Sequence, residues 1–134
     1  MTAELWSLVW SAVLLLVLIL LASAANTRVK SVAWNAGNRD DPAPSTGWPG
    51  RADRAYRNML ETLPVFIILV LVAQVANIHS SNTVLGAQLY LWGRIGHAVL
   101  YHAGIAYVRT LAWLVSIVGL ALIFAEILKA APTA

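Results

Sequence analysis

Hydrophobic residues gather in four long runs that are separated by polar segments. The first run covers residues 5–27 and contains an uninterrupted apolar stretch at 14–21, and the others cover about 51–76, 84–104 and 108–128. Each run is close to the roughly 20 residues that an α-helix needs to cross a bilayer. The pattern predicts an all-α integral membrane protein, a four-transmembrane-helix bundle in which residues 1–134 form a single domain.

The first run has an alternative interpretation as a signal peptide, because Ala-Ser-Ala at 22–24 resembles a cleavage site. However, no basic residue precedes the run, and it is longer than the roughly 7–15 residues of a signal-peptide core. We therefore expect a retained helix.

The segments between the runs predict how the helices are connected. Residues 28–50 are rich in Gly, Pro, Asn and Asp, which predicts a loop without a helix. Residues 77–82 and 102–107 are short connectors, so successive helices are expected to be antiparallel. Pro64 is expected to kink the second span without ending it, as prolines do in membrane helices.

Composition supports a membrane protein and limits the classes of ligand that the protein is expected to bind. The chain is 60% hydrophobic and only 11% charged, with a mean hydropathy of +0.72, whereas soluble domains are about 25% charged. The net charge is +3, and most of the nine basic residues flank the apolar runs, which indicates membrane orientation and anionic ligands but no nucleic acid. The chain has no cysteine, which excludes disulfides, thiolate metal sites and a cysteine nucleophile.

The distribution of basic residues predicts the orientation. Lysine and arginine cluster in the loop 28–50 and at the start of the second span, and they are absent from the N-terminal tail and from residues 77–83. Because basic residues favour the cytoplasmic side, the loop 28–50 is predicted to be cytoplasmic and both termini to lie outside. On this basis Lys30 is an interfacial anchor, as Arg28 and Arg51 could also be, and we interpret Trp6, Trp10, Trp92 and Trp113 as interfacial aromatic residues.

The second span carries polar residues that plain membrane helices lack. Arg54, Asn58 and Glu61 follow i, i+4, i+7 spacing and form one stripe, with Arg51 one turn before it and Arg57 beside Glu61. Ionisable groups inside a membrane are costly unless they are paired or hydrated, so these residues are candidates for a functional site.

The third span carries a matching stripe of Arg94, His97 and Tyr101. Glu61 and Arg94 each lie about ten residues from the cytoplasmic end of their span, at a depth of roughly 15 Å. Equal depth predicts that these two groups neutralise each other. Such a pair could be a structural clamp or part of a ligand site, and the sequence leaves both alternatives open.

The surplus of positive charge favours a ligand-binding role for these residues over a purely structural one. Glu61 can neutralise one arginine, whereas several crowd the same half of the bundle: Arg54, Arg57, Arg94 and Arg109. This surplus suits a carboxylate-bearing ligand held by guanidinium groups. We expect no metal site, because His97 has no second histidine at ligand spacing and His79 is expected on the opposite side of the membrane.

These motifs resemble those of the MAPEG family, the membrane-associated proteins in eicosanoid and glutathione metabolism. Arg-Ala-Tyr-Arg-Asn-Met-Leu-Glu at 54–61, followed by Pro64 and Phe66, resembles the second-helix signature of the family. The segment 93–101, the pair Arg109 and Thr110, and the polar ending of the first span at 26–28 are similar to other family motifs. The loop segments 38–44 and 47–50 resemble bacterial members, and the resemblance covers nearly the whole chain.

The resemblance implies a homotrimer that binds glutathione, as a co-substrate, between subunits near the cytoplasmic side of a bacterial inner membrane. Arg109 would be the catalytic residue that stabilises the glutathione thiolate, with Thr110 where some members have a serine. Arg57 would support the pocket, and Arg28 would reach in from the neighbouring subunit. The pocket itself would be lined by Arg54, Asn58, Glu61, Arg94, His97 and Tyr101.

The activity that the resemblance implies is that of a glutathione transferase or peroxidase acting on lipophilic electrophiles or lipid hydroperoxides from the membrane lipid. The alternative is a non-catalytic membrane scaffold, or a protein that binds anionic lipid, keeping the fold without the activity. A transporter is disfavoured because the chain shows no inverted repeat.

Overall fold

The computed structural model describes residues 1–44 and 46–132. Four long helices follow one another along the chain: α1 (Ala3–Val29), α3 (Gly47–Val75), α4 (Ser81–Ala103) and α5 (Val108–Lys129). A short helix, α2 (Val32–Ala36), lies in the connection between α1 and α3. No strand occurs in the described ranges, which confirms the all-α class.

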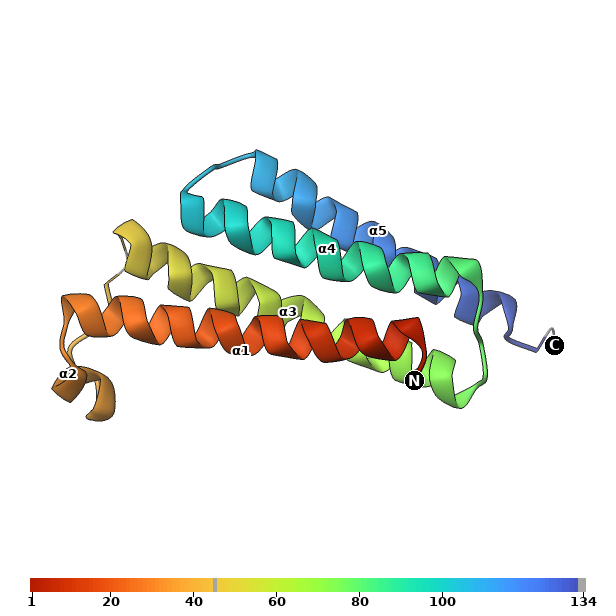
Figure 1. Ribbon diagram of the computed structural model, residues 1–134, viewed down its shortest axis with the longest axis horizontal. Helices are drawn as coiled ribbons and strands as arrows, with labels where there is room; N and C mark the ends of the chain where they lie inside the picture. Colours follow the sequence, from red (N-terminus) through yellow and green to blue (C-terminus); the bar gives the residue numbers. More distant parts are fainter. Residues whose placement is uncertain (45, 133–134) are drawn as a thin grey trace.

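The four long helices run side by side along the long axis of the molecule (Figure 1). The start of α1, the end of α5 and the α3–α4 connection lie at one end, and the α1–α3 and α4–α5 connections lie at the other (Figure 1). Successive long helices are therefore antiparallel, as predicted. Helix α1 contacts α3 and α4, and α4 packs most extensively against α5.

One face of α3 lies in the core, together with buried residues of α1, α4 and α5. Met59, Leu63, Phe66 and Val70 are buried on it at i, i+4, i+7 and i+11. Phe66 stacks on Tyr90 of α4, with ring centroids 4.0 Å apart. Large apolar side chains also cover much of the outer surface of the bundle. An apolar exterior is what a bilayer requires, so this surface supports a membrane location.

Helices α4 and α5 approach each other through glycines. A Cβ atom on Gly86 would lie 2.6 Å from the backbone oxygen of Gly119, and one on Gly93 would lie 2.7 Å from the backbone nitrogen of Ser116. Small residues allow membrane helices to pack with their backbones this close. The close approach fixes the start of α5 next to the end of α4, where candidate site residues lie on both helices.

In the described part of the chain, three helices are long and apolar enough to cross a membrane: α1, α3 and α5. They support a multi-pass integral membrane protein. Helix α4 has 23 residues but is less apolar, because it carries a buried polar face with Thr83, Arg94 and His97.

The loop predicted over 28–50 is partly helical, so that prediction was wrong in two places. Helix α2 forms where Ser31 accepts a hydrogen bond from the Trp34 backbone N–H, at 3.1 Å. The Asn35 amide of α2 also donates to Ser23 Oγ at 2.7 Å and to Thr27 Oγ1 at 2.8 Å. These polar contacts to α1 hold a segment whose composition alone is typical of a loop.

Helix α3 begins at Gly47, earlier than the predicted start at 51. Pro49 lies in its first turn, where a missing N–H leaves no helical hydrogen bond unmade, so the Pro-Gly pair is compatible with helix here. The helix continues through Pro64 to Val75. The prediction that Pro64 does not end the span is confirmed.

Candidate functional site

Two adjoining cavities at the end of the bundle that holds the α4–α5 connection share lining residues, and we call them the outer and the inner cavity. A third cavity at this end, of about 280 Å³, is lined by Ala43, Pro44, Gly50, Asp53, Arg54 and Arg57. The outer cavity, of about 150 Å³, lies between the start of α3 and that connection. The inner cavity, of about 210 Å³, lies further along α3, α4 and α5. The outer cavity is lined by Arg51, Arg54, Tyr101, Gly104, Ile105, Ala106 and Arg109. The inner cavity is lined by Asn58, His97, Tyr101, Arg109, Thr110 and Trp113.

Arg109 and Tyr101 belong to both cavities. The Arg109 guanidinium carbon lies 4.1 Å from the centroid of the Tyr101 ring, a distance typical of a cation–π contact. The Tyr101 ring in turn meets His97 edge-on, with centroids 5.3 Å apart. This stack orients one guanidinium at the junction of the two cavities.

Arg94, one turn before His97 on α4, is buried, with 1% of its surface exposed, and it lines neither the outer nor the inner cavity. Its Nε donates a hydrogen bond to the Met59 sulfur at 3.3 Å. Its Nη1 is buried and makes no hydrogen bond within the described part of the chain. A thioether is a weak acceptor, so this guanidinium is poorly compensated for its loss of water.

The predicted ion pair between Glu61 and Arg94 was wrong, since none joins them in the described residues. Met59 and Glu61 are two residues apart, which turns their side chains about 200° from each other around a helix. Met59 faces Arg94, so Glu61 points to the other side of α3 and is exposed. Glu61 therefore acts on Arg94 only as a more distant charge.

The other predicted residues fall into two groups. Arg54, Asn58 and Thr110 line the cavities, and the buried Asn58 Oδ1 accepts no hydrogen bond from any described residue. Arg57 and Arg28 line neither the outer nor the inner cavity, although Arg57 lines the third cavity with Arg54 and Asp53. The exposed Arg57 lies over the Tyr56 ring, at 6.0 Å from its centroid, and Arg28 is exposed in the last turn of α1.

Five lining residues were not among the predicted site residues: Gly104, Ile105 and Ala106 of the α4–α5 connection, and Arg51 and Trp113, whose side chains carry polar groups. Arg51 was one of the residues interpretable as an anchor, although it lies one turn ahead of Arg54 on the same stripe. Trp113 was interpreted as an interfacial aromatic residue, but it lies one turn after Arg109 and lines the inner cavity. Helical spacing from a predicted residue was the signal that could have identified both.

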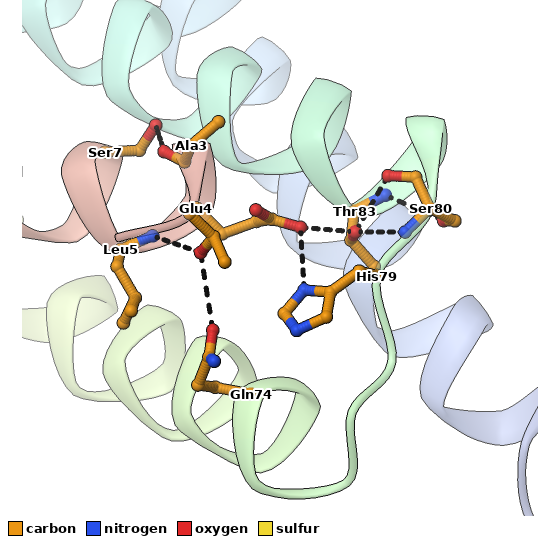
Figure 2. A network of polar contacts seen from close by, with 9 residues as sticks. Ala3, Glu4, Leu5, Ser7, Gln74, His79, Ser80 and Thr83 are labelled. Carbon is orange, nitrogen blue, oxygen red and sulfur yellow. Dashed lines mark hydrogen bonds and ion pairs between the residues drawn. The ribbon is translucent and has the colours of Figure 1, made fainter.

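A second polar cluster lies at the opposite end of the bundle, and Figure 2 shows it. The carboxylate of Glu4, a residue only 5% exposed, accepts a hydrogen bond from Thr83 Oγ1 at 2.7 Å. His79 Nδ1 lies 3.6 Å from the same carboxylate oxygen. Ser80 and Thr83 cap the start of α4 reciprocally. We call these four residues the Glu4 network.

Neither cluster resembles a metal centre. Among the described residues, no group of three or more His, Asp and Glu side chains is arranged to hold a metal ion. The chemistry available at the cavities is that of guanidinium, amide, imidazole and phenol groups, which bind anions and hydrogen-bonding ligands.

Comparison with known proteins assigns a family. The sequence model of the MAPEG family matches residues 6–129, nearly the whole chain. Searches of the curated proteins and of the solved structures found no significant match.

Proposed function

The chain belongs to the MAPEG family, and on that premise we propose that it is a membrane-bound glutathione-binding protein that acts as a glutathione transferase or peroxidase. Its second substrates are lipophilic electrophiles or lipid hydroperoxides that reach the site from the bilayer. The observation that carries the proposal is the pair of adjoining cavities with Arg109 at their junction.

The polar groups at the cavities suit glutathione, which carries two carboxylates, one ammonium group and two amide groups. Arg54 and Arg109 offer guanidinium groups for the carboxylates. The buried Asn58 Oδ1 is an acceptor and the buried Arg94 Nη1 is a donor, and neither makes a hydrogen bond to a described residue. Buried polar atoms are normally paired, so these two atoms favour a polar ligand.

Arg109 is the residue to which we assign the chemistry. A guanidinium beside the glutathione sulfur favours the thiolate over the thiol, as cations do for cysteine. The thiolate is the stronger nucleophile and attacks the electrophilic carbon of the second substrate, whose leaving group departs with the bonding electrons. The contact between Arg109 and the Tyr101 ring supports this role, because it fixes the direction of the guanidinium.

The test of this role is Arg109→Ala, measured by the ultraviolet absorbance of bound glutathione thiolate at neutral pH. We expect the thiolate signal to disappear while much of the binding is retained, since Arg51, Arg54 and Arg94 remain. The matched control is Arg39→Ala, which removes an exposed guanidinium that lines neither cavity. Persistence of the thiolate signal in Arg109→Ala would overturn the role.

Binding itself is tested by calorimetry of the purified protein with glutathione, followed by a conjugation assay with a chlorodinitrobenzene. We expect saturable binding and conjugate formation above the uncatalysed rate. Binding without conjugation or peroxide reduction would favour the alternative function, a non-catalytic scaffold. Binding of anionic lipid in place of glutathione would favour a lipid-binding protein, for which the exposed Arg54 and Arg57 are the supporting observation.

We further propose that the protein is a homotrimer of four-span, single-domain subunits. Glu61 is exposed in the single chain, about 15 Å along α3 from Arg51. A carboxylate that faces lipid is unfavourable, so a neighbouring copy that covers this face of α3 is the simplest remedy. Three further parts of this proposal rest on the resemblance to the family. They are the number of subunits, the role of Arg28 as a residue that reaches into the neighbouring subunit's site, and the assignment of α4 as the fourth membrane span.

Oligomeric state and topology have separate tests. Native mass spectrometry in detergent is expected to show trimers for the parent protein and weakened assembly for Glu61→Lys, and monomers of the parent would contradict the proposal.

We propose the inner membrane, with the loop 28–50 in the cytoplasm. A reporter fused to the C-terminus is therefore expected outside the cytoplasm, and a cytoplasmic signal would reverse the orientation.

A further inference from the structure

The outer cavity differs from the inner cavity in its charge. Its described lining contains three guanidinium groups, those of Arg51, Arg54 and Arg109, and no carboxylate. Among the described residues that line the inner cavity, Arg109 is the one permanent charge, and the others offer amide, imidazole, hydroxyl and indole groups. The outer cavity therefore attracts a purely anionic group more strongly than the inner one does.

Arg51 is the residue that gives the outer cavity this character. Its side chain lies against the α4–α5 connection, where a Cβ atom on Gly104 would be 3.5 Å from the Arg51 guanidinium carbon. Gly104 has a φ of +78°, a conformation that favours glycine, so the connection turns closely past the guanidinium. The Arg51 Nε is buried and donates no hydrogen bond to another described residue. A buried guanidinium donor in this state is a ready partner for a carboxylate.

The neighbouring His102 offers no hydrogen-bond acceptor to the Arg51 guanidinium. His102 accepts a hydrogen bond at Nδ1 from the Trp48 indole N–H, at 2.9 Å. A neutral histidine that accepts at Nδ1 carries its proton at Nε2, and this buried atom also lacks a partner among the described residues. His102 thus offers a donor, and no acceptor, on the side away from Trp48.

The two ends of glutathione place opposite demands on these cavities. The γ-glutamyl end carries an ammonium group beside its carboxylate, whereas the glycine end carries a carboxylate alone. Three guanidinium groups repel an ammonium group and attract a lone carboxylate. The outer cavity therefore suits the glycine end, and the γ-glutamyl end is left to the part of the site nearer Glu61.

We propose that the outer cavity is the subsite for the glycine carboxylate of glutathione, and that Arg51 is the residue that binds this carboxylate. The proposal rests on the proposed function, because it assigns one end of the ligand within the same site. It makes Arg51 a specificity-determining residue: the protein discriminates in favour of a free carboxylate at this end of the thiol ligand.

The test compares glutathione with its ethyl ester at the glycine carboxylate, in calorimetric titrations of the parent protein and of Arg51→Gln. Glutathione is expected to bind the parent at least tenfold more tightly than the ester, because the ester cannot form the charge-assisted hydrogen bonds. In Arg51→Gln the affinity for glutathione is expected to fall about tenfold while that for the ester changes little, so the difference largely disappears.

Two controls separate this role from general effects. Arg39→Gln removes an exposed positive charge that does not line the outer cavity, and it is expected to keep the preference for glutathione over the ester. N-acetylglutathione, which lacks the ammonium group, is expected to lose affinity by the same factor in the parent and in Arg51→Gln. The comparison of ligands on the parent protein does not depend on the folding of any variant.

The outcomes distinguish this subsite from the proposed function. If the parent binds glutathione and its ester equally, or if Arg51→Gln weakens both ligands by the same factor, the subsite assignment is overturned while glutathione binding stands. If the parent binds neither ligand, the proposed function and the subsite assignment both fail.

Discussion

The two ends of the bundle bury charge in different ways. At one end, the Glu4 carboxylate has a hydrogen-bond donor from α4 and a histidine from the α3–α4 connection, so the chain satisfies this carboxylate by itself (Figure 2). At the other end, Arg51 and Arg94 each retain a buried donor without a partner in the described residues. We call these two residues, Arg51 and Arg94, the arginine cluster.

This difference separates a structural role from a binding role. Charge that a fold pairs internally fixes the positions of its helices, and removing one partner leaves the other buried and unpaired. Charge that a fold leaves unpaired adds little to its stability and is available to a ligand or to a neighbouring subunit. On this basis we expect changes in the Glu4 network to alter stability and changes in the arginine cluster to alter binding.

The largest expected effect is that of Arg94→Met on glutathione affinity. We expect the dissociation constant measured by calorimetry to rise about hundredfold, because a charge-assisted hydrogen bond to the ligand is lost. The unfolding temperature is expected to stay constant or to rise, since replacing a poorly paired buried cation by an apolar side chain of similar size is often stabilising.

The opposite result for Arg94→Met would remove the contrast between the two ends. A steep fall in unfolding temperature with unchanged glutathione affinity would show that Arg94 holds the fold. Arg94→Lys is the matched variant: it keeps the positive charge but not the planar donor fork, and it is expected to recover only part of the affinity.

Thr83→Val tests the Glu4 network and is expected to have the opposite profile. The substitution removes the hydroxyl that donates to the buried Glu4 carboxylate, which is expected to destabilise the protein by about 2 kcal/mol. Thermal unfolding in detergent measures this loss. Thr83→Ser keeps the hydroxyl and serves as the control. Glutathione affinity is expected to be unchanged in both variants. A weakened affinity in Thr83→Val alone would show that the Glu4 network also affects ligand binding at the opposite end of the bundle, against the contrast drawn above.

The sequence predicted the helices better than the contacts between them. The apolar runs identified all four long helices, because long apolar runs have a strong signal in length and hydropathy, and three of these helices are apolar enough to cross a membrane. The 3.6-residue period also placed Arg54 and Asn58 on one stripe, and both line cavities in the structure. These predictions use information that is local in the chain.

The incorrect predictions concern how helices are rotated against each other. Equal depth suggested that Glu61 meets Arg94, but depth does not determine which face of α3 is turned toward α4, and Met59 takes that position. The hydrogen bond between Glu4 and Thr83 joins residues 79 positions apart, and no local pattern predicts such a contact. Arg51 was undervalued because an arginine at the end of a span is also typical of an interfacial anchor.

The smallest expected effect is that of His79→Ala, within the same network as Thr83. His79 lies 3.6 Å from the Glu4 carboxylate, and its side chain is 38% exposed. When the imidazole is protonated this contact is an ion pair, and exposed ion pairs contribute about 0.2–1 kcal/mol and weaken further as salt is added. We therefore expect a small loss of thermal stability that high salt reduces, whereas the loss in Thr83→Val is expected to depend little on salt. A loss in His79→Ala as large as that in Thr83→Val would show that the histidine, and not the threonine, is the main partner of Glu4.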